Sequence, residues 1–289
     1  SSGLNVTSDN ITVYNISMGG DVLKTVHEWY KNGAPLEVLN MPFEKNNSYA
    51  EGYTKDYSPY NNSGLVVRAS WNETGGFDGL GYYNFSSTDK QTINVTYSDS
   101  LDFTSEATFV MWFKGRSTPL QSMRVIISKV NDTGTNNYIL GYTESNGLPW
   151  VSNGTQTINC NGGVTALTMD GRWQHLAYRM NNSQVYFYIN GTRLCTESVN
   201  WSFGPVNNRS FLIGRNAGPY VNYFEGGLDD LRVYNSSLSD NQIRLLYQNG
   251  TNTTHSSLTT TSDVWTAQVY PVYTNRSEGL ACNASMTIL

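Results

Sequence analysis

Short runs of β-forming residues, interrupted at close intervals by turn residues, set the strongest constraint on how this chain folds. The runs are rich in Val, Ile, Tyr, Phe and Thr, and clusters of Gly, Asn, Asp and Ser separate them. They cover residues 11–16, 25–30, 91–97, 107–113, 125–129, 185–189, 211–213 and 228–234. Strands of this length and spacing are typical of an antiparallel sandwich rather than of alternating strands and helices. We therefore predict an all-β fold.

One helix is predicted, over residues 240–248. Ser239 and Gln242 stand in the order of a capping box, and Leu238 and Ile243 are placed as a hydrophobic staple around it. An Asn-Gly pair follows the apolar pattern, and this pair is a common helix end. The expected helix therefore directly follows the last strand of the middle region.

The surface is expected to be polar but poor in charge. Ser, Thr and Asn number 30, 29 and 33 of the 289 residues, whereas charged residues are only 14%. The net charge of −5 gives no basic field for a phosphate backbone, so nucleic acid is not an expected partner. The chain also has no apolar run of about 18 residues, so no membrane-spanning segment is predicted.

Asn-X-Ser/Thr sequons are far more frequent than the composition explains. Random placement of this many Asn, Ser and Thr residues would give about 7 sequons. The chain has 19, at Asn5, Asn10, Asn15, Asn46, Asn61, Asn72, Asn84, Asn94, Asn131, Asn153, Asn181, Asn190, Asn200, Asn208, Asn235, Asn249, Asn252, Asn275 and Asn283. Such an excess indicates selection for N-linked glycan, and we therefore predict an extracellular, cell-surface glycoprotein.

The three cysteines allow one disulfide. Cys160 and Cys195 lie in one region, and a bridge between them would close a loop of about 36 residues, while Cys282 is left over. Two free thiols are the alternative. No Cys or His spacing suggests zinc.

The two ends of the chain each hold too few strands for a core of their own. Residues 1–36 and 263–289 carry two or three expected strands each, and the Thr/Ser-rich stretch 251–262 has the composition of a connector. Two incomplete halves at opposite ends can complete each other. We predict a discontinuous domain of 1–36 plus 263–289, interrupted by a large insertion over 37–250.

The insertion resembles the laminin-G-like, concanavalin A-like jelly-roll family. Seven segments occur in the family's order, at residues 41–64, 75–85, 100–114, 170–180, 185–194, 211–216 and 224–250. The resemblance implies two curved antiparallel sheets packed face to face, with the short helix after the closing strand.

The flanks resemble, less specifically, an Ig-like or PKD-like sandwich repeat of microbial, especially archaeal, surface proteins. Residues 29–33 look like its central strand and turn, and 264–289 look like its final strands. The resemblance implies a non-enzymatic structural or adhesion protein, such as a subunit of a surface layer or filament. A carbohydrate-binding module and a glycosidase-related domain are the alternatives.

Catalytic residues are not evident. Some relatives of the jelly-roll family hydrolyse polysaccharides with a Glu-x-Asp-x-x-Glu strand, and this string is absent. Of the three histidines, His175 is expected within a strand as a structural residue, whereas His27 and His255 fall in the flank and the connector. We therefore expect no enzymatic activity.

Calcium is the one cofactor that the sequence suggests. Alternation in the strand 228–234 puts Asp229 on the face of Leu231 and Val233, and a buried carboxylate needs hydrogen bonds, a proton or a cation. The turn 55–64 supplies Asp56 and further oxygen ligands, which suit Ca²⁺. The alternative is that each Asp accepts backbone hydrogen bonds.

Glycans and other copies of the chain are the expected partners. Sugar rings stack on exposed aromatic side chains, and the loop-like stretches offer four of these, Trp150, Trp201, Tyr220 and Tyr223. The end of the chain, 284–289, has a strand pattern whose open edge suits head-to-tail assembly with a second copy.

Overall fold

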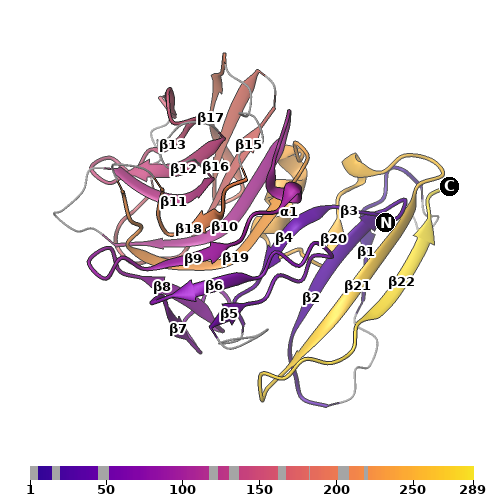
Figure 1. Cartoon of the computed structure of the whole chain (residues 1–289). Coiled ribbons are helices and arrows are strands. Elements are labelled where there is room, and N and C mark those ends of the chain that lie inside the picture. Colours follow the sequence, from indigo (N-terminus) through magenta and orange to yellow (C-terminus); the bar gives the residue numbers. More distant parts are fainter. Residues whose placement is uncertain are drawn as a thin grey trace.

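The protein is almost entirely β, as predicted. The computed structural model describes residues 6–14, 20–44, 52–116, 123–129, 137–161, 167–181, 183–200, 208–217 and 221–289. Two large antiparallel sheets pack face to face as a jelly-roll sandwich, and a smaller sheet lies beside them (Figure 1).

The first large sheet contains the closing strand of the jelly roll. Its strand order is β17 (Thr192–Ser198), β16 (Gln184–Ile189), β15 (Gln174–Met180), β10 (Ala107–Gly115), β19 (Gly226–Tyr234), β8 (Tyr82–Phe85) and β7 (Ser70–Asn72). β4 (Glu37–Met41) also pairs with β19, beside β8. The longest strands, β10 and β19, therefore lie at the centre of the sheet.

The second large sheet covers the inner face of the first. Its order is β14 (Thr157–Asn159), β13 (Pro149–Ser152), β12 (Tyr138–Thr143), β11 (Met123–Lys129), β18 (Phe211–Ile213), β9 (Thr92–Val95), β6 (Gly64–Val67) and β5 (Tyr53–Thr54). Alternating residues of both sheets form one core, to which β10 contributes Phe109, Met111 and Phe113. Alternation leaves Trp112 and Lys114 on the outer face of the first sheet.

Strands from both ends of the chain form the third sheet, here called the terminal sheet. Its order is β22 (Cys282–Thr287), β21 (Val264–Tyr273), β2 (Val22–Lys31) and β3 (Ala34–Pro35). β2 and β21 pair along nearly their whole length, from Val22 opposite Tyr273 to Lys31 opposite Trp265. The two end segments therefore complete one sheet, although they are more than 200 residues apart in sequence.

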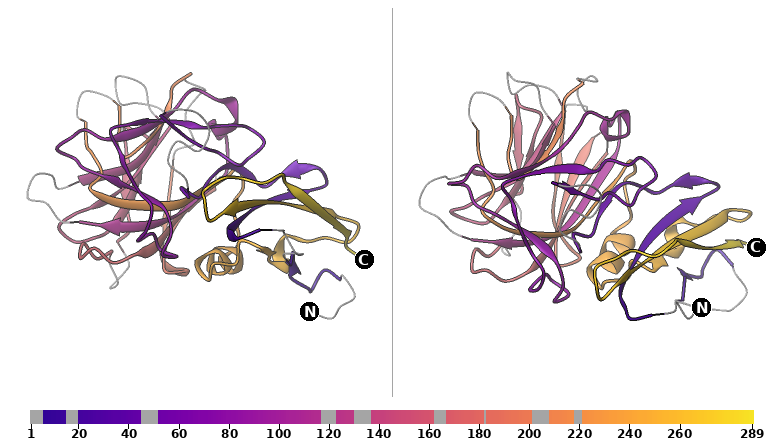
Figure 2. Two further views of the ribbon diagram at one scale, coloured as in Figure 1. Left: turned by 90° about the horizontal axis from the view of Figure 1, so that it is seen from below. Right: turned by 60° about the horizontal axis from the view of Figure 1, so that its bottom comes forward.

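The predicted helix is observed as α1 (Asp240–Tyr247). The hydroxyl of Ser239 accepts a hydrogen bond from the amide of Gln242, and Leu238 and Ile243 join one apolar cluster on the outer face of the first sheet. Two short 3-10 turns, η1 (Asp99–Leu101) and η2 (Ser256–Leu258), are also present. Figure 2 shows the helix between the sandwich and the terminal sheet. No helix in the described segments is long and apolar enough to cross a membrane.

The stretch 251–262 is more than the connector that its composition predicts. It contains η2 and β20 (Thr253–Thr254), which pairs with β1 (Ile11–Thr12) as a two-stranded layer. Leu258 packs against the cluster of Trp29 and Trp265 in the terminal sheet. The other side chains of the stretch 251–262 bind the two-stranded layer largely through hydrogen bonds, such as the one between Thr253 and Thr12. A search for apolar periodicity therefore misses this stretch.

Candidate functional site

A cleft opens between the terminal sheet and the sandwich. Its volume is about 810 Å³. One wall comes from β2 and from Gly20 shortly before it, one from the loop that precedes β8, and one from the segment that follows α1. These walls contribute, in turn, Gly20, Val22–Thr25 and His27; Asp78 and Leu80; and Asn249, Thr251 and Asn252. Most of these side chains are polar, so the cleft suits a polar ligand.

Lys24 on β2 joins two walls of the cleft. Its Nζ lies 2.5 Å from Oε1 of Glu44 and 2.8 Å from Oδ2 of Asp78, and it sits 5.5 Å from the centre of the Phe77 ring. Burial alone would lower the pKa of Lys24, but the surrounding carboxylates, with Glu44 the strongest, outweigh burial and raise that pKa. Lys24 therefore stays charged and holds the loop that carries Asp78 against the terminal sheet.

Asp229 binds the same loop through a backbone hydrogen bond. Its side chain is fully buried, and its two oxygens accept hydrogen bonds from the amides of Phe77 and Asp230, at 3.0 and 2.8 Å. Burial raises the pKa of Asp229 well above its usual range. Gly76 is required here, because a Cβ at this position would lie 2.5 Å from Oδ2 of Asp229.

His27 offers a ring nitrogen without a partner. The side chain is 3% exposed, and Nδ1 lies 3.3 Å from the hydroxyl oxygen of Thr251. No described residue bonds to Nε2. Burial, and then the charge of Arg232, lower the pKa of His27 to about 4, so the ring is neutral at physiological pH. A neutral imidazole can donate or accept a hydrogen bond, and Nε2 is a buried polar atom in the wall of the cleft.

A buried polar network fixes the wall behind His27. Asn40 on β4 donates to Oε1 of Glu28 at 2.6 Å and to the carbonyl of His27 at 3.1 Å. Arg232 on β19 donates to the same carbonyl at 3.4 Å and lies 3.5 Å from Glu37. Burial raises the pKa of Glu28 and of Glu37. Jelly-roll strands therefore bind the backbone of β2 directly, which keeps the cleft wall rigid.

The structure gives no support to the predicted calcium site. Asp56 accepts hydrogen bonds from the amides of Asn40, Ser58 and Asn62 and from the Ser58 hydroxyl, at 2.6–2.9 Å. Donors on both of its oxygens repel a cation. Asp229 likewise accepts amide donors, and the described residues include no group of three or more His, Cys, Asp or Glu that could hold a metal ion. Asp56 and Asp229 therefore both match the alternative to a calcium site, in which each carboxylate accepts backbone hydrogen bonds.

Two of the four residues of the predicted aromatic sugar platform, Trp150 and Tyr223, lie in the part of the chain that the structure describes. Trp150 was expected in a loop, but it lies in β13, is 3% exposed, and packs with Val125 and Ile139. Tyr223 is half-buried, with the Arg215 guanidinium 5.8 Å from its ring centre. Trp201 and Tyr220 lie outside the described residues. The prediction for Trp150 is therefore wrong, because an aromatic residue beside a Pro and a Gly can still occupy a buried strand.

Sequence reasoning missed Lys24, His27 and Asp78, the polar groups that define the cleft. The available signal was the strand around residues 24–28, in which Lys24, His27 and Glu28 interrupt an apolar pattern. Polar residues at buried strand positions need partners, so such an interruption marks a polar junction or a site. The partners themselves lie on distant segments and cannot be identified from the strand alone.

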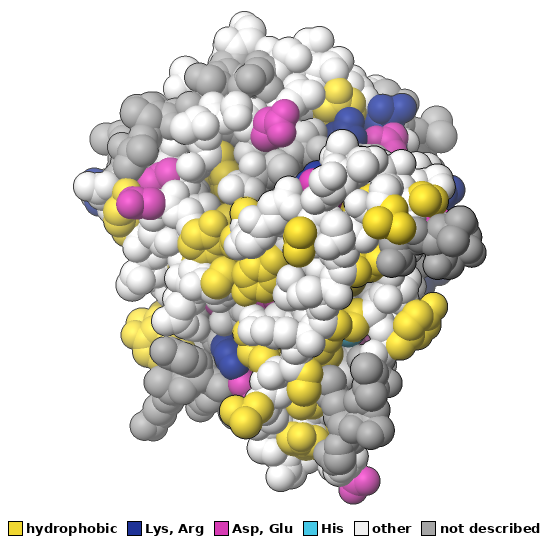
Figure 3. All heavy atoms as spheres, turned by 90° about the vertical axis from the view of Figure 1, so that its right-hand side faces the viewer, with side chains coloured by type: hydrophobic (Ala, Val, Ile, Leu, Met, Phe, Trp, Pro, Cys, Tyr) yellow, Lys and Arg dark blue, Asp and Glu magenta, His cyan; other side chains and the backbone are white. Residues whose placement is uncertain are grey.

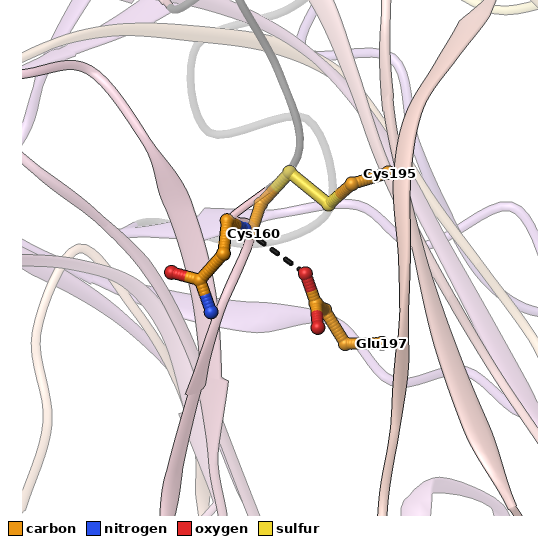
Figure 4. The surroundings of a disulfide bond; sticks show 4 residues. Cys160, Cys195 and Glu197 are labelled. Carbon is orange, nitrogen blue, oxygen red and sulfur yellow. Dashed lines mark hydrogen bonds between the residues drawn. A yellow bond between two sulfur atoms is a disulfide. The ribbon is translucent and has the colours of Figure 1, made fainter.

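Cys160 and Cys195 form a disulfide, whereas Cys282 is free and exposed. Cys160 follows β14 and Cys195 belongs to β17, which are the edge strands of the two large sheets. Beside the bridge, Glu197 accepts a hydrogen bond from the amide of Asn161 at 3.0 Å (Figure 4). The disulfide therefore ties the two sheets together along one side of the sandwich.

The sequons lie at accessible positions. The asparagines of four sequons, Asn5, Asn15, Asn46 and Asn131, lie outside the described residues, and none of the other fifteen is buried. By contrast, four asparagines outside sequons are buried: Asn40, Asn62, Asn137 and Asn216. Figure 3 shows one face of the molecule, on which charged side chains, in dark blue and magenta, are few. The described sequon asparagines therefore all keep some exposed surface, although Oδ1 of Asn94 in β9 is buried.

The sequence profile of the family described as the Concanavalin A-like lectin/glucanases superfamily matches residues 86–244. A search of curated proteins finds no match. Among solved structures, the binding domain of Paraclostridial Mosquitocidal Protein 1 is similar, with a TM-score of 0.57 and 16% identity over 74% of this chain and 52% of that one. The chain thus spans about half the length of that toxin domain.

Two further similar structures are complexes, one with arabinotriose and one with SialylT. Domain 4 of AbnA, a GH43 extracellular arabinanase from Geobacillus stearothermophilus in complex with arabinotriose, matches with a TM-score of 0.56 and 16% identity, over 76% of this chain and all of that domain. The binding domain of Botulinum Neurotoxin DC in complex with SialylT matches with a TM-score of 0.53 and 15% identity, over 74% of this chain and 51% of that one. At these identities the likeness shows the fold.

Proposed function

This chain belongs to the Concanavalin A-like lectin/glucanases superfamily. On that premise we propose that it is an extracellular carbohydrate-binding module that binds sugar in the cleft between the terminal sheet and the sandwich. One observation carries the assignment to this cleft: polar side chains from three separate segments, among them Lys24, Asp78 and Asn249, converge on it. The sugar complexes of the arabinanase domain and the neurotoxin domain support a carbohydrate as the ligand.

The cleft chemistry matches that of a carbohydrate. Each sugar hydroxyl both donates and accepts, and the lining groups include acceptors on Asp78, a donor on Lys24, the hydroxyl of Thr251, and amides on Asn249 and Asn252. No aromatic side chain lines the described cleft, so hydrogen bonds rather than ring stacking would hold the sugar. Direct hydrogen bonds from rigid groups give specificity at modest affinity.

Binding without hydrolysis is part of the proposal. A glycosidase needs two carboxyl groups placed on either side of the scissile bond. In this cleft, Asp78 and the neighbouring Glu44 both pair with Lys24, and Asp229 accepts two backbone amides. Asp78 is the one carboxylate among the described lining residues, so the described cleft does not present the pair that hydrolysis requires.

The extracellular, glycosylated state is supported by two independent features. The sequon asparagines are accessible wherever they are described, and disulfides persist mainly in oxidising compartments outside the cytosol. Both features favour a secreted or cell-surface protein.

A glycan array probed with unglycosylated protein tests the proposal. We expect selective binding to a small set of oligosaccharides and no release of shorter products on long incubation. If the protein binds no glycan on the array, the proposed function is wrong. Cleavage of a bound oligosaccharide would contradict the proposal that the protein binds sugar without hydrolysing it.

A second candidate function is a subunit of a microbial surface layer or filament, in which the terminal sheet is an Ig-like repeat. The observation that favours it is β22, an edge strand whose residues are mostly exposed and which pairs only with β21. Leu280 and Leu289, at either end of β22, are 92% and 69% exposed. An open edge with apolar ends suits strand addition by a second copy.

Electron microscopy of the native material tests this second candidate. Filaments that disappear in a Leu280→Glu, Leu289→Glu variant would support assembly through β22. Both side chains are exposed, so the variant should keep its fold, whereas deletion of the last residues would also remove Ile288, which is buried at 2% exposure. A strictly monomeric native protein would contradict the candidate.

A further inference from the structure

Two sequon asparagines, Asn249 and Asn252, line the cleft that we propose binds sugar. Asn249 follows Gln248, the C-cap residue of α1. Its backbone has a φ of 59° and its amide donates to the carbonyl of Leu246 at 3.1 Å, which terminates the helix. Its side chain is exposed and makes no hydrogen bond to any described residue. The Nδ2 of Asn249 is therefore free to carry a glycan at the rim.

The residues after Asn249 are held in place. The hydroxyl of Thr251, which completes the first sequon, lies 3.3 Å from Nδ1 of His27. Asn252 donates from Nδ2 to the carbonyl of Val13 at 3.3 Å. A glycosylated amide keeps one N–H, so this bond is compatible with a glycan on Asn252. Both attachment points therefore have fixed positions at the cleft.

We propose that the N-linked glycan on Asn249, together with that on Asn252, folds into the cleft, so that the protein's own sugar is the resident ligand. This inference rests on the proposed function, because it requires that the cleft binds carbohydrate. The first sugar of each glycan is attached at a lining residue, so no long linker is needed to bring it to the polar groups of the same cleft, such as Asp78.

Attachment strongly favours the tethered sugar over a free one. A ligand on a short tether has an effective concentration of about 1 mM, which lowers the apparent affinity for a free sugar about tenfold if that sugar binds with a Kd of about 0.1 mM. Glycosylation at these two sequons therefore decides whether the cleft is open to an external glycan. Chains that lack both glycans would bind external sugar, and chains that carry them would bind it about tenfold more weakly.

The test uses variants that remove each sequon without disturbing the cleft. Asn249→Gly keeps the backbone conformation that ends the helix, because Gly is favoured there. Thr254→Val removes the second sequon and leaves Asn252 intact. The Thr254 side chain is fully buried and its hydroxyl has no described partner, so Val fits the same space. Asn235→Gln, at an exposed sequon outside the cleft lining, is the control.

The probe is the glycan released enzymatically from the native protein and measured by calorimetric titration. Unglycosylated protein should bind it. Glycosylated wild type and the Asn235→Gln variant should bind it at least about tenfold more weakly than the glycosylated Asn249→Gly, Thr254→Val double variant. Mass spectrometry of glycopeptides should find Asn249 or Asn252 occupied in the native protein.

Two outcomes separate this inference from the proposed function. If glycosylated wild type binds the probe as tightly as the double variant, or if both sequons are unoccupied, the tethered glycan does not fill the cleft, although the cleft can still bind other sugars. If unglycosylated protein binds neither the probe nor any glycan of the array, the proposed function itself fails.

Discussion

Nζ of Lys24, in a strand near the start of the chain, lies 2.8 Å from Oδ2 of Asp78, in a loop of the inserted jelly roll. This ion pair crosses from the terminal sheet to the sandwich and forms part of the cleft lining. Together with Glu44 and the network around Arg232, it makes the junction of the two units a polar, rigid surface. The properties of the cleft therefore depend on contacts between segments that are distant in sequence.

Replacing Lys24 should destabilise the protein strongly. Lys24→Met leaves Glu44 and Asp78 without their common cation, and only the Arg276 guanidinium, 3.4 Å from Glu44, remains close to that carboxylate. Removal of one partner from a buried ion pair costs several kcal/mol, so we expect a loss of about 3 kcal/mol in the free energy of unfolding. Urea denaturation measures the loss.

Lys31→Met is the matched control, since Lys31 lies on the same strand and pairs with Asp263. The Lys31 side chain is 31% exposed, so water screens its pair and the expected loss is about 1 kcal/mol or less. Equal losses in the two variants would show that the Lys24 cluster has no special role at the junction.

The disulfide should contribute substantially to stability. Removing it with Cys160→Ser and Cys195→Ser releases a loop of about 36 residues, which in the chain-entropy model costs about 4 kcal/mol. Cys282→Ser, at an exposed free thiol, should change the free energy of unfolding by about 0.5 kcal/mol or less. A double Ser variant as stable as wild type would contradict the claim that the disulfide between the two sheet edges stabilises the fold.

Acid should destabilise the protein through His175. This side chain is fully buried between strands, has no described hydrogen-bond partner, and burial lowers its pKa to about 3. The unfolded chain binds a proton below pH 6.5 that the native chain excludes, so the contribution of His175 falls as the pH drops from about 6.5 towards 3. At pH 5 the loss amounts to about 2 kcal/mol relative to pH 8.

Comparison with His175→Leu isolates this effect, because the other titrating groups cancel in the difference. Between pH 8 and pH 5, wild type should lose about 2 kcal/mol more than the variant in chemical denaturation. A difference in stability that does not change with pH would show that His175 titrates normally.

The native protein should be heavily glycosylated. Its mass should exceed the 32.2 kDa of the polypeptide by many glycan units, and a majority of the 19 sequons should be occupied. Glycopeptide mass spectrometry counts the occupied sites. Fewer than about five occupied sequons would remove the main support for an extracellular compartment.

Local patterns in the sequence predict local structure well in this protein. The capping box at Ser239 gives the start of α1, and the run of β-forming residues at 107–113 lies within β10. These features depend on hydrogen bonds and side-chain directions within a few residues, so a short window contains the necessary information.

Features that depend on distant partners were predicted less well. The Thr-rich stretch 251–262 looked like a connector, because side-chain hydrogen bonds to residues near the start of the chain leave no apolar period. Trp150 is buried by a cluster on the outer face of its sheet. The cleft itself requires β2 and the loop of Asp78 to meet, and the sequence of either segment alone carries no sign of that contact.

The carbohydrate cleft is tested most directly by the dissociation constant of unglycosylated protein for its best glycan-array ligand. This constant is measured for wild type, Asp78→Asn and Asp89→Asn. Asp78→Asn keeps an oxygen for the amide of Leu80 but removes a charged acceptor from the cleft, whereas Asp89 is exposed and outside its lining. A hydrogen bond to a charged group is worth about 1.5–3 kcal/mol, so Asp78→Asn should weaken binding at least about tenfold and Asp89→Asn should not. Equal affinities for all three proteins would contradict binding in this cleft.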